Sequence, residues 1–245
     1  LALNESSLWS GGPYNPASPE ALAALPEVRR LIFAGQYREA DALAQAKLMR
    51  RPLGQASYQP LGDLLLDFSG HENASDYRRE LDLDTAIARV TYTVAGVHYT
   101  REVFASAADH VIVVRLTADQ PGKLDPVLSF ASQQPGIESW RPQAEKWGWS
   151  GGLGLRGRNR DFGDIAGALR FEAVVRILAE GGRVMPGEDS VSVRSADAVT
   201  LVLAAATNYR SWQDLSADPK QLVAAALDRA VAKGYAALLR DHLAD

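Results

Sequence analysis

The residues best suited to chemistry lie in a turn-rich segment near the start of the chain. Asn4 and Glu5 supply an amide and a carboxylate, and Trp9 and Tyr14 supply two aromatic rings in the same loop. Sugar sites use this combination, because rings stack on the C–H faces of a sugar while carboxylates and amides bind its hydroxyls. The segment therefore predicts one wall of a carbohydrate site.

A second group of this kind lies near the middle of the chain. Its tryptophans are Trp140, Trp147 and Trp149, and charged residues stand among them (Glu138, Arg141, Glu145 and Lys146). We take Trp147 and Trp149 as further candidates for substrate binding or for contact with a neighbouring domain. The alternative is that these rings only anchor long loops on a hydrophobic core.

Other kinds of site find little support. The chain has no cysteine, which excludes disulfides, thiolate metal sites and thiol nucleophiles. The four histidines are scattered with no pair four residues apart, so we expect no metal site and no cofactor. Residues 148–154 are rich in glycine but lack the lysine and the following helix of a phosphate-binding loop.

One pair of carboxylates is closely spaced. Asp82 and Asp84 would share one face of a strand, where their like charges repel one another. Arg78, Arg79 and Glu80 come just before them. A charged, solvated segment is therefore the favoured interpretation, and an acid–base pair is the alternative.

The composition is that of an ordinary globular protein. Of 245 residues, 47% are hydrophobic and 23% are charged, which is enough apolar material for a core without disulfides. The net charge of −4 argues against nucleic acid as a partner. No apolar run approaches the roughly 18 residues of a membrane span, and no signal peptide precedes Leu1. We expect no membrane partner either, and we expect the chain to be a piece of a longer protein.

Helical spacing marks both ends of the chain, and a period of two marks its middle. We expect helices within residues 19–49, where Ser18 precedes Pro19, and again from Asp218, which precedes Pro219. Between them, alternating segments with tight turns predict antiparallel strands, of which residues 169–177 form a half-buried one. The expected fold is mainly β: a large antiparallel β-sandwich over residues 1–217, with a helical insertion at about 19–49 and a helical linker over 218–245.

Seven blocks, in order along nearly the whole chain, resemble the amino-terminal domain of glycoside hydrolase family 95. The first has the sequence NESSLWSGGPY at residues 4–14, and the third has SYQPLGDL at residues 57–64. The other blocks are residues 25–29, 76–86, 101–106, 111–116 and 233–235.

The resemblance implies a hydrolase of the α-L-fucosidase type, which removes terminal, typically α-1,2-linked L-fucose with inversion and without a metal. It also implies a first domain of the supersandwich type, as in galactose mutarotases, followed by a linker and an (α/α)6 barrel that holds the catalytic groups. An inverting enzyme needs an acid and a base about 6.5–9.5 Å apart. By the resemblance both lie beyond residues 1–245, so we expect no catalytic residue here. The chain would shape or support the substrate pocket.

Two other functions stay open. A stand-alone carbohydrate-binding module would use the same aromatic residues without a catalytic domain. A mutarotase-like sugar epimerase would need a histidine and a carboxylate on a concave face, and His98 and Glu102 share one face of a predicted strand. The partners that the resemblance implies are a fucosylated glycan and the chain's own catalytic barrel, in a secreted or periplasmic bacterial protein.

Overall fold

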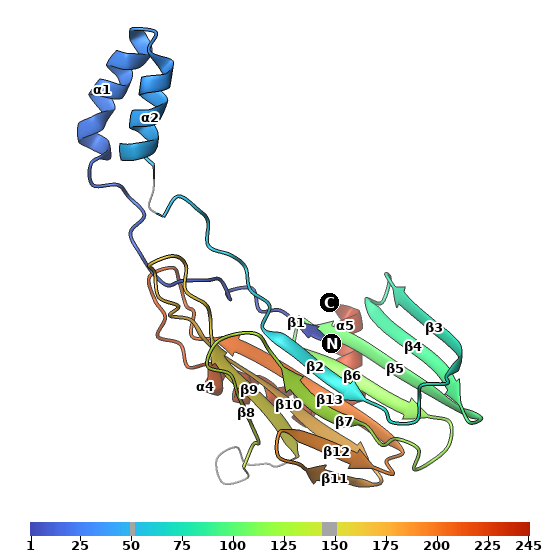
Figure 1. The fold of residues 1–245 in the computed structure, drawn as a ribbon. Helices are drawn as coiled ribbons and strands as arrows, with labels where there is room; N and C mark the ends of the chain where they lie inside the picture. Colours follow the sequence, from blue (N-terminus) through green and yellow to red (C-terminus); the bar gives the residue numbers. More distant parts are fainter. Residues whose placement is uncertain (50–51, 144–150) are drawn as a thin grey trace.

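Two antiparallel sheets packed face to face form most of the protein (Figure 1). The computed structural model describes residues 1–49, 52–143 and 151–245. Within these residues the smaller sheet has five strands, in the order β1 (Ala2–Leu3), β2 (Gly62–Asp67), β7 (Val127–Ala131), β12 (Ser190–Arg194) and β11 (Arg183–Pro186). The larger sheet has eight, in the order β3 (Ser75–Asp82), β4 (Ile87–Val94), β5 (Val97–Ser106), β6 (Val111–Ala118), β13 (Ala198–Thr207), β10 (Arg170–Glu180), β9 (Gly152–Arg158) and β8 (Glu138–Trp140). The predicted fold class is confirmed.

Alternation of apolar and polar residues produces the hairpin β4–β5. Val90, Tyr92 and Val94 all point into the core between the sheets. Ala95 and Gly96 turn the chain with φ angles of 49° and 77°, the left-handed values that a two-residue hairpin loop needs. The next strand then pairs in register, with Val94 opposite Val97.

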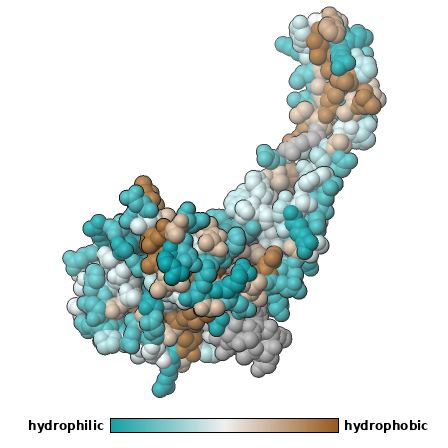
Figure 2. Space-filling model, turned by 180° about the vertical axis from the view of Figure 1, so that it is seen from behind, coloured by the Kyte–Doolittle hydropathy of each residue, from teal (hydrophilic) through white to brown (hydrophobic). Residues whose placement is uncertain are grey.

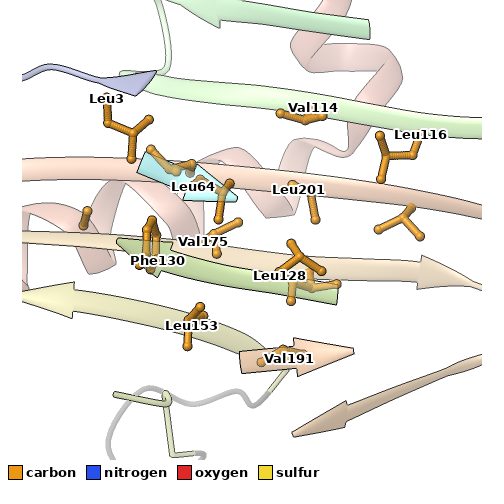
Figure 3. Packing of buried hydrophobic residues seen from close by; sticks show 14 of the residues in the cluster. Leu3, Leu64, Val114, Leu116, Leu128, Phe130, Leu153, Val175, Val191 and Leu201 are labelled. Atoms are coloured by element: carbon orange, nitrogen blue, oxygen red, sulfur yellow. The ribbon is translucent and has the colours of Figure 1, made fainter. Parts of the chain in front are cut away.

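The main core lies between the two sheets, where side chains from both meet (Figure 3). Leu64 and Leu128 of the smaller sheet are fully buried, as are Leu153 and Leu201 of the larger sheet. Removing such apolar surface from water is the largest favourable term in folding. This core holds together strands that are distant in the sequence.

Two helices cover the outer face of the larger sheet. Val223 and Leu227 of α4 (Pro219–Lys233) pack over strands β10 and β13, and Leu238 of α5 (Tyr235–Ala244) packs over β5, all within one apolar cluster. Residues 171–175 are therefore buried on both faces of the sheet. The prediction that this strand is half-buried is wrong, because α4 covers the face that was expected to meet water.

Capping fixes the start of α4 as the sequence predicts. Asp218 Oδ1 accepts hydrogen bonds from the backbone nitrogens of Lys220 and Gln221, at 3.0 and 3.4 Å. Gly234, with φ of 74°, then separates α4 from α5. The role of residues 218–245 as a linker to a further domain stays a prediction. No helix in the described part of the chain is long and apolar enough to cross a membrane.

The helices α1 (Ala21–Phe33) and α2 (Tyr37–Lys47) form a hairpin that projects from the sandwich (Figure 1). Val28, Leu31 and Ala40 bury their apolar surface between the two helices. Figure 2 shows hydrophobic atoms, coloured brown, on the surface of this projecting part. Ser18 does not cap α1 as expected, because a turn at residues 19–20 comes first and the helix begins without a side-chain cap.

Candidate functional site

Residues 4–14 form a loop that leads from β1 toward the helical hairpin (Figure 1). Leu8 is fully buried and anchors the loop on the sandwich. Ser10 makes two hydrogen bonds with Ser57: its backbone nitrogen donates to the Ser57 carbonyl oxygen at 2.9 Å, and its Oγ accepts from the Ser57 nitrogen at 2.8 Å. The loop is thus held against residues far along the chain.

A buried amide fixes the middle of this loop. Asn159 follows β9 and is fully buried. Its Nδ2 donates to the carbonyl oxygens of Trp9 and Gly11, and its Oδ1 accepts from the Leu169 nitrogen at 3.0 Å. Asn159 is not among the predicted site residues, since an isolated asparagine after a strand carries no pattern that reveals such a role.

Glu5 makes hydrogen bonds within the loop itself. Its Oε2 accepts hydrogen bonds from the nitrogen and from Oγ of Ser7, at 2.9 and 2.6 Å. The Ser7 hydroxyl also bonds to the Thr207 hydroxyl at the end of β13. Among the described residues no donor reaches the second oxygen, Oε1. Half of the carboxylate therefore stabilises a turn, and the other half stays available to a ligand.

The two aromatic rings of the loop lie in different surroundings. The Trp9 ring is 40% exposed, meets the edge of the Tyr58 ring at a centroid distance of 5.3 Å, and donates from Nε1 to the Ser6 carbonyl oxygen. Tyr14 is half-buried, with its ring 6.4 Å from that of Phe162. Asn4 is exposed. Trp9 therefore presents the main aromatic surface.

Two adjoining cavities open beside this loop and share Trp9 and Tyr209 as lining residues. The first, of about 510 Å³, lies between the loop, β13 and α4, and Glu5 lines it. The second, of about 440 Å³, is lined by Tyr14 and Trp212 as well. Both volumes fall in the range of about 300–1,000 Å³ that is usual for small-molecule sites. The structure thus brings Glu5, Trp9 and Tyr14 together around one hollowed surface.

Tyr209 and Trp212 belong to this surface, although they are not among the predicted site residues. They lie between the buried strand β13 and the capped start of α4, and their exposed fractions are 43% and 65%. The sequence feature that could have indicated them is the presence of aromatic residues in a loop between two well-predicted elements. What the sequence could not reveal is that this loop lies beside residues 4–14.

The second aromatic group does not join the first within the described residues. Trp147 and Trp149 lie outside those residues. The Trp140 ring lies flat against Gly154, where an added Cβ atom would come within 2.3 Å of it. Trp140 lines a different cavity, together with Glu138 and other charged residues.

The carboxylate pair at the end of β3 is part of a turn. Asp82 Oδ1 accepts from the backbone nitrogens of Asp84 and Thr85, at 3.0 and 3.2 Å. Only Asp82 belongs to the strand, because β3 ends there. The acid–base alternative is therefore wrong, since the two side chains do not share a strand face.

The histidine and carboxylate of the epimerase alternative do not converge. His98 and Glu102 lie about 13 Å apart along β5, given about 3.3 Å per residue. Glu102 is occupied by Arg89 at 2.8 Å and by the Tyr235 hydroxyl at 3.0 Å. Burial, and then the charge of Glu102, raises the pKa of Tyr235 to about 12. This cluster fastens α5 to the sheet and gives the epimerase alternative no support.

Across the residues that the structure describes, no three histidine, aspartate or glutamate side chains come together as a metal site. The features that remain for chemistry are an exposed aromatic surface, a half-free carboxylate and two adjoining cavities at one loop.

Comparison with known proteins shows the family to which the chain is related. Residues 1–212 match the family model described as "Glycosyl hydrolase family 65, N-terminal domain". The chain is 35% identical over 236 residues to "Alpha-L-fucosidase 2" of Arabidopsis thaliana, a match that covers 90% of this chain and 28% of that protein. It is 28% identical over 267 residues to "Probable alpha-fucosidase A" of Aspergillus niger, a match that covers 99% of this chain and 31% of that protein.

A solved structure shares the fold. "Putative kojibiose phosphorylase from human microbiome" superposes with a TM-score of 0.50 and 10% sequence identity, over 80% of this chain and 28% of that chain. This chain therefore spans 28–31% of the length of the proteins compared here.

The predicted resemblance to the N-terminal domain of a glycoside hydrolase with α-fucosidase relatives is confirmed. The family model that matches is that of glycosyl hydrolase family 65, whereas the sequence resemblance was to glycoside hydrolase family 95. The chain belongs to the glycosyl hydrolase family 65 N-terminal domain family.

Proposed function

We propose that this chain is the first domain of an α-L-fucosidase-type hydrolase and forms one wall of the substrate pocket without catalysing hydrolysis itself. The observation that supports this most directly is the exposed aromatic surface of Trp9, Tyr209 and Trp212 around two adjoining cavities. Such rings would stack on the C–H faces of a sugar, and Glu5 Oε1 would accept a hydrogen bond from a sugar hydroxyl. The fucosidase relatives supply the substrate class.

The partners in this proposal are a glycan with a terminal, typically α-1,2-linked L-fucose and a catalytic barrel domain that faces the loop at residues 4–14. The barrel would supply the acid and the base of an inverting hydrolysis. The extra length of the relatives leaves room for such a domain. We further propose that the protein acts outside the cytoplasm, as secreted or periplasmic glycan hydrolases do.

A chimera tests the proposal. This chain replaces the matching region of the Arabidopsis relative, and release of fucose from 2′-fucosyllactose is measured. We expect the chimera to hydrolyse the substrate and the isolated 245-residue chain to release no fucose. Trp9→Ala should raise the KM of the chimera about tenfold, the equivalent of about 1.4 kcal/mol of lost ring contact.

Tyr37→Ala is the matched control, because Tyr37 is an exposed aromatic residue on the distant hairpin. Its KM should not change. A folded Trp9→Ala chimera with unchanged KM and kcat would contradict the proposal that Trp9 lies in a wall of the substrate pocket. Release of fucose by the isolated chain would contradict the proposal that the chain is inactive alone. The carbohydrate-binding module alternative instead predicts that the isolated chain binds 2′-fucosyllactose and that Trp9→Ala abolishes this binding.

A further inference from the structure

A second group of polar side chains surrounds a buried carboxylate on the outer face of the larger sheet. Glu138 of β8, Arg156 of β9 and Glu172 of β10 stand directly opposite one another on three neighbouring strands. Side chains in such positions are close enough to interact. The row ends beside the start of α4, where Asp218 and Lys220 also act on Glu172.

Arg156 pairs with Glu138 and leaves Glu172 without a hydrogen bond. Its Nε and Nη2 donate to the two oxygens of Glu138, at 3.0 and 2.7 Å. Glu172 is 8% exposed and accepts no hydrogen bond from the described residues. Burial raises the pKa of Glu172, against the smaller opposing effects of Arg156 and Lys220. Its oxygens border two cavities, so water or a ligand can supply the donors that the described side chains do not.

Two cavities meet at this carboxylate, and Arg156 and Glu172 line both of them. One, of about 290 Å³, is lined also by Trp140, Gln143 and Lys220. The other, of about 600 Å³, extends along the start of α4. Neither shares a lining residue with the cavities beside residues 4–14. The buried carboxylate therefore belongs to a separate hollow that is open to small molecules.

The charges around this hollow favour a neutral ligand. The smaller cavity combines two carboxylates, Glu138 and Glu172, with three cations, Arg141, Arg156 and Lys220. An anion would meet Glu172 at the floor, and a metal cation would meet the guanidinium groups. A hydroxyl suits both, because it donates to a carboxylate and accepts from a guanidinium or ammonium group.

We propose that Glu172 is the centre of a second binding site, which takes a neutral oligosaccharide. Hydroxyls of one sugar unit donate to the carboxylate of Glu172 and accept from Lys220, while the Trp140 ring, backed by Gly154, contacts the C–H face of the sugar. The site consists of residues of this chain alone and does not depend on the proposed fucosidase activity.

An NMR titration of the whole chain tests this site. The probes are 2′-fucosyllactose, maltotriose and cellotriose, with inorganic phosphate as the competing ligand class. We expect at least one of the sugars to shift the amide signals of residues 136–143, 154–158, 170–172 and 216–220. Glu172→Gln should weaken that binding about tenfold, because a charged acceptor is replaced by a neutral one. This variant keeps the side-chain shape and removes a buried charge, so we expect it to fold.

Glu188→Gln is the matched control, because Glu188 is exposed and lies between β11 and β12 in the smaller sheet. It should bind like the wild type. Absence of binding by all three sugars would overturn the proposal, as would unchanged binding by Glu172→Gln. Phosphate binding that Glu172→Gln strengthens would identify an anion site instead. Sugar binding that only Trp9→Ala abolishes would overturn the second site and assign the binding to residues 4–14.

Discussion

Asn159→Ala tests whether one buried amide holds the candidate loop in place. In the wild type, the Asn159 side chain bonds to the carbonyl oxygens of Trp9 and Gly11 and to the nitrogen of Leu169. Alanine removes all three bonds at once. It leaves the Trp9 carbonyl oxygen and the Leu169 nitrogen without a partner, at a position that is fully buried in the wild type, whereas the Gly11 carbonyl oxygen keeps a hydrogen bond from the Ala168 nitrogen at 3.2 Å.

The magnitude follows from these three bonds. Each lost hydrogen bond costs about 1 kcal/mol on average, and more where the remaining partner stays buried. We therefore expect the free energy of unfolding to fall by about 3 kcal/mol. In a domain of this size 1 kcal/mol lowers Tm by about 2–4 °C, so the expected decrease in Tm is about 6–12 °C.

Thermal unfolding followed by circular dichroism measures this change, with Asn15→Ala as the matched control. Asn15 is an exposed asparagine of the neighbouring segment and accepts one hydrogen bond, from the Ala17 nitrogen at 3.0 Å. Its replacement should change the free energy of unfolding by less than about 0.5 kcal/mol. If Asn159→Ala unfolds within that same margin of the wild type, the amide does not hold the loop and the reasoning fails.

Three further changes test the core and two titratable groups, of which Glu172 is buried and His71 is half-buried. Leu227→Ala should cost about 2–5 kcal/mol in urea unfolding, because Leu227 is fully buried between α4 and the larger sheet, whereas Leu222→Ala on the exposed side of that helix should cost little. Glu172→Gln should raise stability at pH 7, because burial raises the pKa of Glu172 and its ionised form destabilises the fold. That gain should vanish as the pH falls below 4.5, the ordinary pKa of the group. Burial, and then Arg101, lowers the pKa of His71 below 6.5, so stability should fall as the pH drops below that value, and less so in His71→Gln.

Each of these has a clear contrary result. Equal losses in Leu227→Ala and Leu222→Ala would mean that α4 is not packed on the sheet. A Glu172→Gln variant that is less stable than the wild type at pH 7 would mean that the carboxylate has a partner in the fold. Identical pH profiles of the wild type and His71→Gln would remove the histidine as a cause of acid sensitivity.

Local sequence signals determined the elements whose partners lie close by in the chain. The hairpin β4–β5 was predictable from alternation and from the turn at Ala95 and Gly96, because a two-residue turn and its flanking strands fix one another. The start of α4 followed from Asp218 and Pro219, because a cap is satisfied within three residues.

The composition of the candidate site was also predictable in part. Glu5, Trp9 and Tyr14 lie within one loop, so their common place on the surface follows from the sequence. That Tyr209 and Trp212 lie beside them could not be predicted from the sequence, because about 200 residues separate these two residues from the loop along the chain. Only the pairing of β13 at the centre of the larger sheet brings that segment alongside.

The sequence by itself determined a mainly β chain with a capped helix toward its end and a sugar-type group of residues near its start. The tertiary structure alone decided which strands are neighbours, which faces α4 covers, and that Asn159 fixes the loop at residues 4–14. The physical reason is that these features depend on contacts between distant segments. Such contacts form only when the whole core is buried at once, and no local spacing of residue types records them.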